Sequence, residues 1–368
     1  MNNKLSTSDK LTIQAITSDV FSWISLYNNK VQSIDPILSI MILPYLSMSY
    51  DGILKFLEVK KLKNGILCDT QYRSIIERIR ICVKLFDNNT IESYLSNFRR
   101  IHEIHLERFS IQNRKRFFLA KLFGWDYDLG IFTYKNHYVA NTYLIEWFIS
   151  SNDQKVPFVL NTESSREMSV IQGKFFGSLA SQLGITLDMI TEPNINPLPI
   201  QNSDTHFTRF FSGRFCNQDL YVKLILFNVM NMINILQFYL GDIFVLCNHL
   251  SIRMRYICYY HSINTIELVQ QYLHKQSQLD NSCKRRFRNL LSKQKRSLIK
   301  SRFRNCMAHY SLMDYLDDIA IDNNNFMDLL IQQQFNMSVE SFSLKLSEIM
   351  NSMSVELEAW FYDSSPRS

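Results

Sequence analysis

Arg304, Asn305 and His309 are the side chains of this sequence whose types and spacing best suit acid–base chemistry on a phosphate. Arginine is a fixed cation that can hold two phosphate oxygens, histidine exchanges a proton near neutral pH, and asparagine can orient either group. RNA cleavage by the neighbouring 2′-hydroxyl needs these parts and no metal. His309 would act as general base or acid, and Arg304 would stabilise charge on the phosphorus. We therefore expect a site without metal or cofactor.

The spacing within this motif sets a geometric condition. Five residues along a continuous helix place two side chains about 140° apart, so Arg304 and His309 do not share a face. They converge only if the chain bends at a helix start, or if two copies of the motif meet in a symmetric dimer. We expect a homodimer, and we expect the apolar helix over residues 224–241 to form part of its interface through its asparagines.

A basic segment leads into the motif. Residues 284–304 contain ten lysines or arginines and no acidic residue. Such a run is expected to contact the backbone of RNA largely without regard to sequence. The residues expected to bind substrate there are Lys293, Lys295, Arg296, Lys300 and Arg302. Replacing the first three of these with alanine is expected to flatten the salt dependence of RNA binding.

Residues 304–310, Arg-Asn-Cys-Met-Ala-His-Tyr, resemble the Arg-x4-6-His motif of the HEPN superfamily. The resemblance implies a small helical bundle and a metal-independent endoribonuclease of the toxin or antiviral-defence kind, with the active site where two motifs face each other in a dimer. Carried over by position, it implies catalytic roles for Arg304, Asn305 and His309, with Tyr310 beside the substrate. Family members often add an acidic residue from an earlier helix, for which Asp242 and Glu267 are both open.

The resemblance also implies partners. A nuclease of this kind must be restrained in its own cell, so an inhibitor, an antitoxin or a phage-derived trigger is expected besides the RNA substrate. The N-terminal half would serve as sensor or regulator. The alternative is a non-catalytic bundle that binds RNA or a nucleotide through the same basic face, or an adaptor; Arg304 would then cap a helix end and His309 would be structural.

The fold that must position these residues is expected to be mainly α. Nine glycines and seven prolines in 368 residues disfavour glycine-rich phosphate loops and turn-dense β-sandwiches. The prolines around residue 195 suggest a boundary between a mainly helical domain (1–200) and a HEPN-like bundle (205–365). Apolar spacing predicts helices over residues 11–27, 75–86, 168–183, 220–240, 242–261, 265–277, 284–302 and 339–362, with a break at the motif and a short hairpin within 123–160.

Cysteine usage and the absence of a targeting pattern bear on the compartment. Seven cysteines form no CxxC pair, and the first ten residues lack an apolar core, which favours a reduced, cytoplasmic chain. Residues 224–241 are nearly long enough to span a membrane, but their four amide side chains are costly in lipid, so no membrane role is expected. Gly173 and Gly177 are interpreted as allowing close helix packing, and Cys247, His249, Cys258 and His261 as core residues rather than metal ligands.

Overall fold

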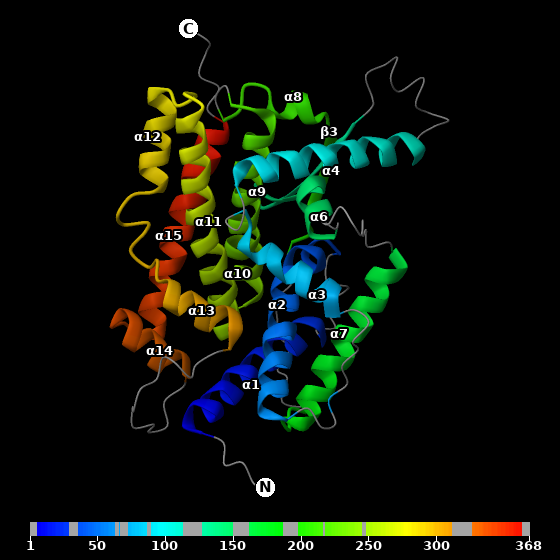
Figure 1. Ribbon diagram of the computed structural model, residues 1–368, viewed down its shortest axis with the longest axis vertical. Helices are drawn as coiled ribbons and strands as arrows, with labels where there is room; N and C mark the ends of the chain where they lie inside the picture. The colour runs from blue at the N-terminus through cyan, green and yellow to red at the C-terminus, as the bar shows by residue number, and fades with distance from the viewer. Residues whose placement is uncertain are drawn as a thin grey trace.

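The computed structural model describes residues 6–28, 36–62, 66, 73–86, 90–112, 127–149, 162–186, 198–215, 218–244, 248–310 and 326–362. The mainly α fold expected from the sequence is confirmed (Figure 1). Before residue 200 the described helices are α1 (Thr7–Asn28), α2 (Pro36–Lys60), α3 (Arg73–Ile81), η1 (Cys82–Lys84), α4 (Ile91–Gln112), α6 (Thr142–Ile149) and α7 (Thr162–Gln182). After it they are α8 (Phe207–Phe211), α9 (Leu220–Asn234), the π-turn η3 (Ile235–Tyr239), α10 (Leu240–Ile243), α11 (His249–Lys275), α12 (Asn281–Leu290), α13 (Ser301–His309), α14 (Phe326–Phe335) and α15 (Val339–Tyr362).

A small antiparallel sheet, ordered β2-β1-β3, contains the predicted hairpin. Strands β1 (Leu129–Tyr134) and β2 (His137–Asn141) are joined by Lys135 and Asn136, both at positive φ, as a two-residue hairpin turn requires. Strand β3 (Gln201–Thr205) pairs with β1 from a distant part of the sequence. Residues just after the expected domain boundary therefore complete a sheet that begins well before it.

Helices α9, α11 and α15 lie side by side at the centre of the bundle (Figure 1). The expected dimer interface on α9 is wrong, because Asn228, Asn231 and Asn234 are fully buried inside this chain. Asn228 accepts a hydrogen bond from Asn141 at 2.7 Å, and Asn234 donates to the carbonyl of Tyr138 at 3.0 Å. A helix turned inward in this way offers its amides to its own chain rather than to a second copy.

Two helix boundaries differ from those expected. The helices predicted over 242–261 and 265–277 are one helix, α11, since Ile263, Ile266 and Val269 continue its buried face without interruption. The single helix predicted over 284–302 is instead two, α12 and α13, separated by turns. Side chains of α11 hold those turns: the Tyr259 hydroxyl donates to the carbonyl of Lys295 at 2.6 Å, and the Tyr256 hydroxyl donates to that of Leu298 at 3.0 Å.

Helices from both sides of residue 200 share one continuous apolar core. Helix α1 packs against α11, and α2 packs against α13, so the motif helix lies where the two parts of the chain meet (Figure 1). The division into a regulatory and a catalytic domain stays a prediction. It rests on Pro193, Pro197 and Pro199, of which only Pro199 lies within the described residues.

Two described stretches, Ile37–Lys60 and Leu220–Ile243, are long and apolar enough to cross a membrane by length and composition alone. Most of their side chains are buried inside the protein, which is also what core helices of a globular fold look like. They are therefore weak grounds for a membrane role.

Candidate active site

Helix α13 carries the motif and buries its apolar side chains against the rest of the protein. Phe303, Cys306 and Met307 are buried, and the Phe303 ring meets the Tyr256 ring edge-on at 4.6 Å between centroids. Arg304 and Asn305 are half-buried and His309 is exposed. The predicted break at the motif is wrong, because α13 continues unbroken from Ser301 to His309. No bend therefore brings the Arg304 and His309 side chains onto one face.

Tyr310 ends this helix and anchors it to the interior. It adopts a left-handed conformation (φ 52°), which a non-glycine residue holds only when its surroundings impose it. Its ring is buried, and its hydroxyl donates to Asp19 Oδ2 of α1 at 2.5 Å. Burial raises the pKa of the Tyr310 hydroxyl, and the negative charge of Asp19 adds to this rise. Expected to lie beside substrate, Tyr310 instead fixes the position of the residue before it.

Arg253 of α11 completes this buried anchor. Its Nε lies 2.8 Å from Asp19 Oδ2, its guanidinium stacks 4.3 Å from the centre of the Tyr310 ring, and it donates to the carbonyl of Met307 at 2.5 Å. Burial raises the pKa of Asp19, and the charge of Arg253 opposes that rise. One arginine thus pairs with α1 and satisfies a carbonyl at the end of α13, where the helix has no further amides to offer.

Helix α2 approaches the other side of the anchor at Gly52. A methyl group at this glycine would lie 2.8 Å from Cδ2 of the Tyr310 ring, so only glycine fits. The neighbouring Asp51 is almost fully buried and forms ion pairs with Lys55 at 2.9 Å and with Arg80 of α3 at 3.1 Å. The close approach at Gly52 brings this charged group toward the exposed end of α13.

His309 therefore lies in a positively charged environment. Partial desolvation and the positive charges of Arg80, Arg304 and Lys84 lower the pKa of His309 to about 4, and Asp51 opposes the shift. Partial desolvation of the ring is the largest cause of this shift, and the three cations add to it, although the residue reaches solvent. At neutral pH the ring is uncharged and can accept a proton.

The motif side chains are available to a ligand. Among the described residues, the side chains of Arg304, Asn305 and His309 make no hydrogen bond or ion pair within the protein. Arg304 rests against the ring of Tyr260, with 5.2 Å between its guanidinium carbon and the ring centre. A half-buried arginine without a counter-ion attracts an anion, and phosphate is the anion that its planar fork fits best.

The basic segment before the motif is less available than expected. The ammonium of Lys295 is largely buried and donates to the carbonyl of Asn289 at 3.0 Å; burial lowers its pKa. Arg296 pairs with Glu267 of α11 at 2.7 Å, and the Lys300 ammonium donates to the carbonyl of Gln334. The remaining two expected substrate-binding residues, Lys293 and Arg302, are exposed.

The acidic residue beside the site is Asp51, which the sequence analysis missed. Asp242 accepts from the Tyr134 hydroxyl at 2.5 Å and pairs with Lys135, while Glu267 is held by Arg296. Neither is among the groups whose charge acts on His309. The one signal for Asp51 was an acidic residue next to a glycine inside an otherwise apolar helix.

The described residues contain no cluster of three or more His, Cys, Asp or Glu side chains that could hold a metal ion. Of the four residues weighed as a metal quartet, Cys247 lies outside the described part, His249 bonds Ser18 at 3.2 Å, and Cys258 lies 3.8 Å from the hydroxyl of Ser262.

Comparisons with protein-family models, with curated proteins and with solved structures found no match for this chain.

Proposed function

We propose that this protein is a metal-independent endoribonuclease of the HEPN kind, acting as a toxin or in antiviral defence. The observation that carries the proposal is the exposed position of His309, whose pKa is lowered by partial desolvation and by the charges of Arg80, Arg304 and Lys84. A proton acceptor surrounded by cations suits a polyanion whose own hydroxyl must be deprotonated before it attacks. RNA has that hydroxyl, and DNA lacks it.

In the proposed reaction, His309 accepts the proton of a ribose 2′-hydroxyl, and the 2′-oxygen forms a bond to the adjacent phosphorus. The bond from phosphorus to the 5′-oxygen breaks, and that oxygen takes up a proton from water or from the imidazolium. The products are a 2′,3′-cyclic phosphate and a 5′-hydroxyl. Arg304, with Arg80 and Lys84 nearby, stabilises the charge that builds up on the phosphoryl oxygens, and Asn305 orients the substrate.

The low pKa of His309 fits this sequence of events. Neutral imidazole is the form that accepts a proton, and desolvation and the surrounding cations keep the ring neutral well below pH 7. A bound phosphate adds negative charge next to the ring and raises its pKa, which helps it hold the proton that it has taken. Substrate binding therefore increases the affinity of His309 for the proton that it accepts.

A homodimer remains part of the proposal. Arg304 and His309 diverge on one straight helix, so a second copy is one way to bring both to the same phosphate. Mixing Arg304→Ala chains with His309→Ala chains then restores activity at one of the two shared clefts. An active monomer by light scattering would instead assign the required positive charge to Arg80 and Lys84 of the same chain.

The second candidate function is a non-catalytic module that binds RNA or a nucleotide. Its support is the same set of cations, because Arg304 without a counter-ion attracts phosphate whether or not a bond is cleaved. Binding without cleavage does not require the basicity of His309. The two candidates therefore differ in the consequence of removing this one side chain.

The test is a digest of end-labelled tRNA and mRNA by purified protein with EDTA present. We expect cleavage, and we expect His309→Ala to reduce its rate by about 10²- to 10⁴-fold, the usual contribution of a general base. His274→Ala, which removes an exposed histidine from the far end of α11, is the matched control and should cleave normally. RNA binding without cleavage by the unmodified protein would favour the binding module.

A further inference from the structure

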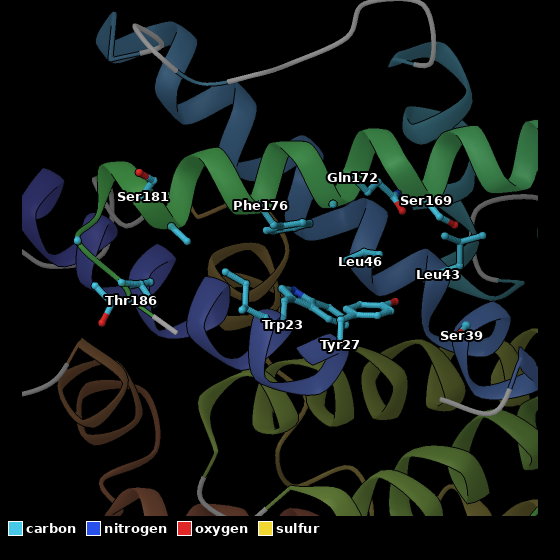
Figure 2. Close-up of a pocket in the computed structure, with 16 residues that line it drawn as sticks. Trp23, Tyr27, Ser39, Leu43, Leu46, Ser169, Gln172, Phe176, Ser181 and Thr186 are labelled. Atoms are coloured by element: carbon cyan, nitrogen blue, oxygen red, sulfur yellow. The ribbon is translucent and has the colours of Figure 1, made fainter. Parts of the chain in front are cut away.

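A cavity of about 710 Å³ lies between α1, α2 and α7, away from the motif (Figure 2). Trp23 and Tyr27 of α1 form one wall, and Phe176 of α7 faces them. Ligand pockets of folded proteins have volumes of roughly 300–1,000 Å³, so this cavity is large enough for a drug-sized molecule. The described residues that line it include no acidic or basic side chain.

Helix α7 is unusual because it carries two glycines on its cavity side, where packing between helices does not require them. Methyl groups built at Gly173 and Gly177 meet no atom of the described residues within 4 Å, so close packing against a described helix does not require these glycines and the interpretation that they serve such packing is wrong. Each glycine inside a helix costs about 1 kcal/mol relative to alanine. Both glycines line the cavity, so the space that they leave is part of it.

The opposite wall is aromatic. The Trp23 and Tyr27 rings are stacked with an angle of 28° between their planes and 6.4 Å between centroids. Phe176, on the α7 side, lies 6.5 Å from Trp23. Aromatic rings on both sides of the cavity suit a ligand that is itself a planar ring system. Hydroxyl groups of Ser39, Ser169, Ser181 and Thr186 also line the cavity and can bond uncharged polar groups on such a ligand.

We propose that this cavity binds an uncharged, planar aromatic small molecule, and that its occupancy is communicated along α1 to the motif. Trp23 lies one helical turn after Asp19, and Asp19 holds both Tyr310 and Arg253 at the end of α13. A ligand packed against the exposed Tyr27, which stacks on the buried Trp23, restricts α1 and, through Asp19, the helix end that positions His309. The binding site itself does not depend on the proposed nuclease activity.

Nile red, an uncharged planar aromatic dye, is a suitable probe. We expect saturable binding at one site per chain, seen as a rise in dye fluorescence. Gly177→Phe places a ring in the open space, and we expect it to weaken binding by at least roughly tenfold. Gln182→Phe adds the same ring to an exposed position of α7 outside the cavity and should bind as the unmodified protein does. Gly177→Ala, which meets no atom, provides a milder variant if the larger side chain disturbs folding.

Two results would overturn the binding site. One is equal Nile red affinity in all variants, which would mean non-specific adsorption. The other is self-association of the unmodified protein that Gly177→Phe abolishes, which would make the cavity a contact between copies. Communication is measured separately, as slower hydrogen exchange of the amides of residues 301–310 when the dye is bound. Unchanged exchange at saturating dye would refute that part of the proposal, whatever the outcome for RNA cleavage.

Discussion

The buried contact between Tyr310 and Asp19 allows a sharp test of how the motif is held. Tyr310→Phe removes only the hydroxyl, because the phenylalanine ring can still stack on Arg253 at 4.3 Å. A hydrogen bond to a charged group contributes about 1.5–3 kcal/mol, and here both groups are buried. We therefore expect the variant to lower the free energy of unfolding by about 2 kcal/mol.

The assay is urea unfolding followed by circular dichroism, with Tyr127→Phe as the matched control. Tyr127 is 45% exposed, so losing its hydroxyl should change the free energy of unfolding by less than about 0.5 kcal/mol. Asp19→Asn alone and combined with Tyr310→Phe complete a double-mutant cycle, in which we expect a coupling energy of about 1–3 kcal/mol. Equal stability of Tyr310→Phe and Tyr127→Phe, or no coupling, would refute the anchor.

Three further predictions concern the site. The pKa of His309 is lowered to about 4, and a general base fails when it is protonated, so kcat/KM of the unmodified protein should fall only near pH 4. Arg80→Gln removes a positive charge that disfavours the imidazolium, so it should raise the pKa of His309 and move that fall to higher pH. Gly52→Ala should destabilise the protein by about 1–3 kcal/mol, because its methyl group meets a buried ring at 2.8 Å; unfolding in urea measures this. Replacing Arg80 and Lys84 with glutamine should reduce the salt slope of single-stranded RNA binding by about 0.7–1.4, since the ion pair with Asp51 leaves Arg80 only part of its charge for phosphate. Lys295→Gln should leave the slope nearly unchanged because that ammonium is buried.

Each of these three predictions would be contradicted by a specific result. A fall of kcat/KM near pH 6.5 in the unmodified protein would show that the cations do not act on His309. Full stability of Gly52→Ala would mean that α2 does not press on the end of α13. A larger loss of salt dependence in the lysine variant than in the double variant would place the RNA on the turns before α13.

The sequence predicted the helical class, the hairpin and the long last helix because apolar spacing is a local property of the chain. Predictions from the sequence were wrong where contacts between different helices determine the local structure. The apolar spacing of the basic segment predicts one amphipathic helix, but the Tyr256 and Tyr259 hydroxyls of the preceding helix α11 bond carbonyls of the turns that interrupt it. The asparagines of α9 were assigned to a dimer interface because nothing local reveals that Asn141 and Tyr138 meet them.

The candidate site, too, could be predicted only in part from the sequence. Arg304, Asn305 and His309 were identifiable from residue type and spacing alone. Arg80, Lys84 and Asp51 were not, since they come from segments more than 200 residues earlier and reach the motif only through the packing of α2 and α3. Their charges act together with desolvation on the pKa of His309, so the electrostatics of the site could not be foreseen from the motif.

The proposed metal-independent cleavage of RNA by its 2′-hydroxyl is tested most directly by the chemical nature of the ends that cleavage produces. An RNA oligonucleotide is digested in EDTA, its products are identified by mass spectrometry, and the same sequence with 2′-O-methyl riboses is run alongside. We expect 2′,3′-cyclic phosphate and 5′-hydroxyl ends from the first and no cleavage of the second, because the attacking 2′-oxygen is then blocked. Cleavage that requires magnesium, leaves 3′-hydroxyl ends and proceeds on the methylated strand would contradict the account.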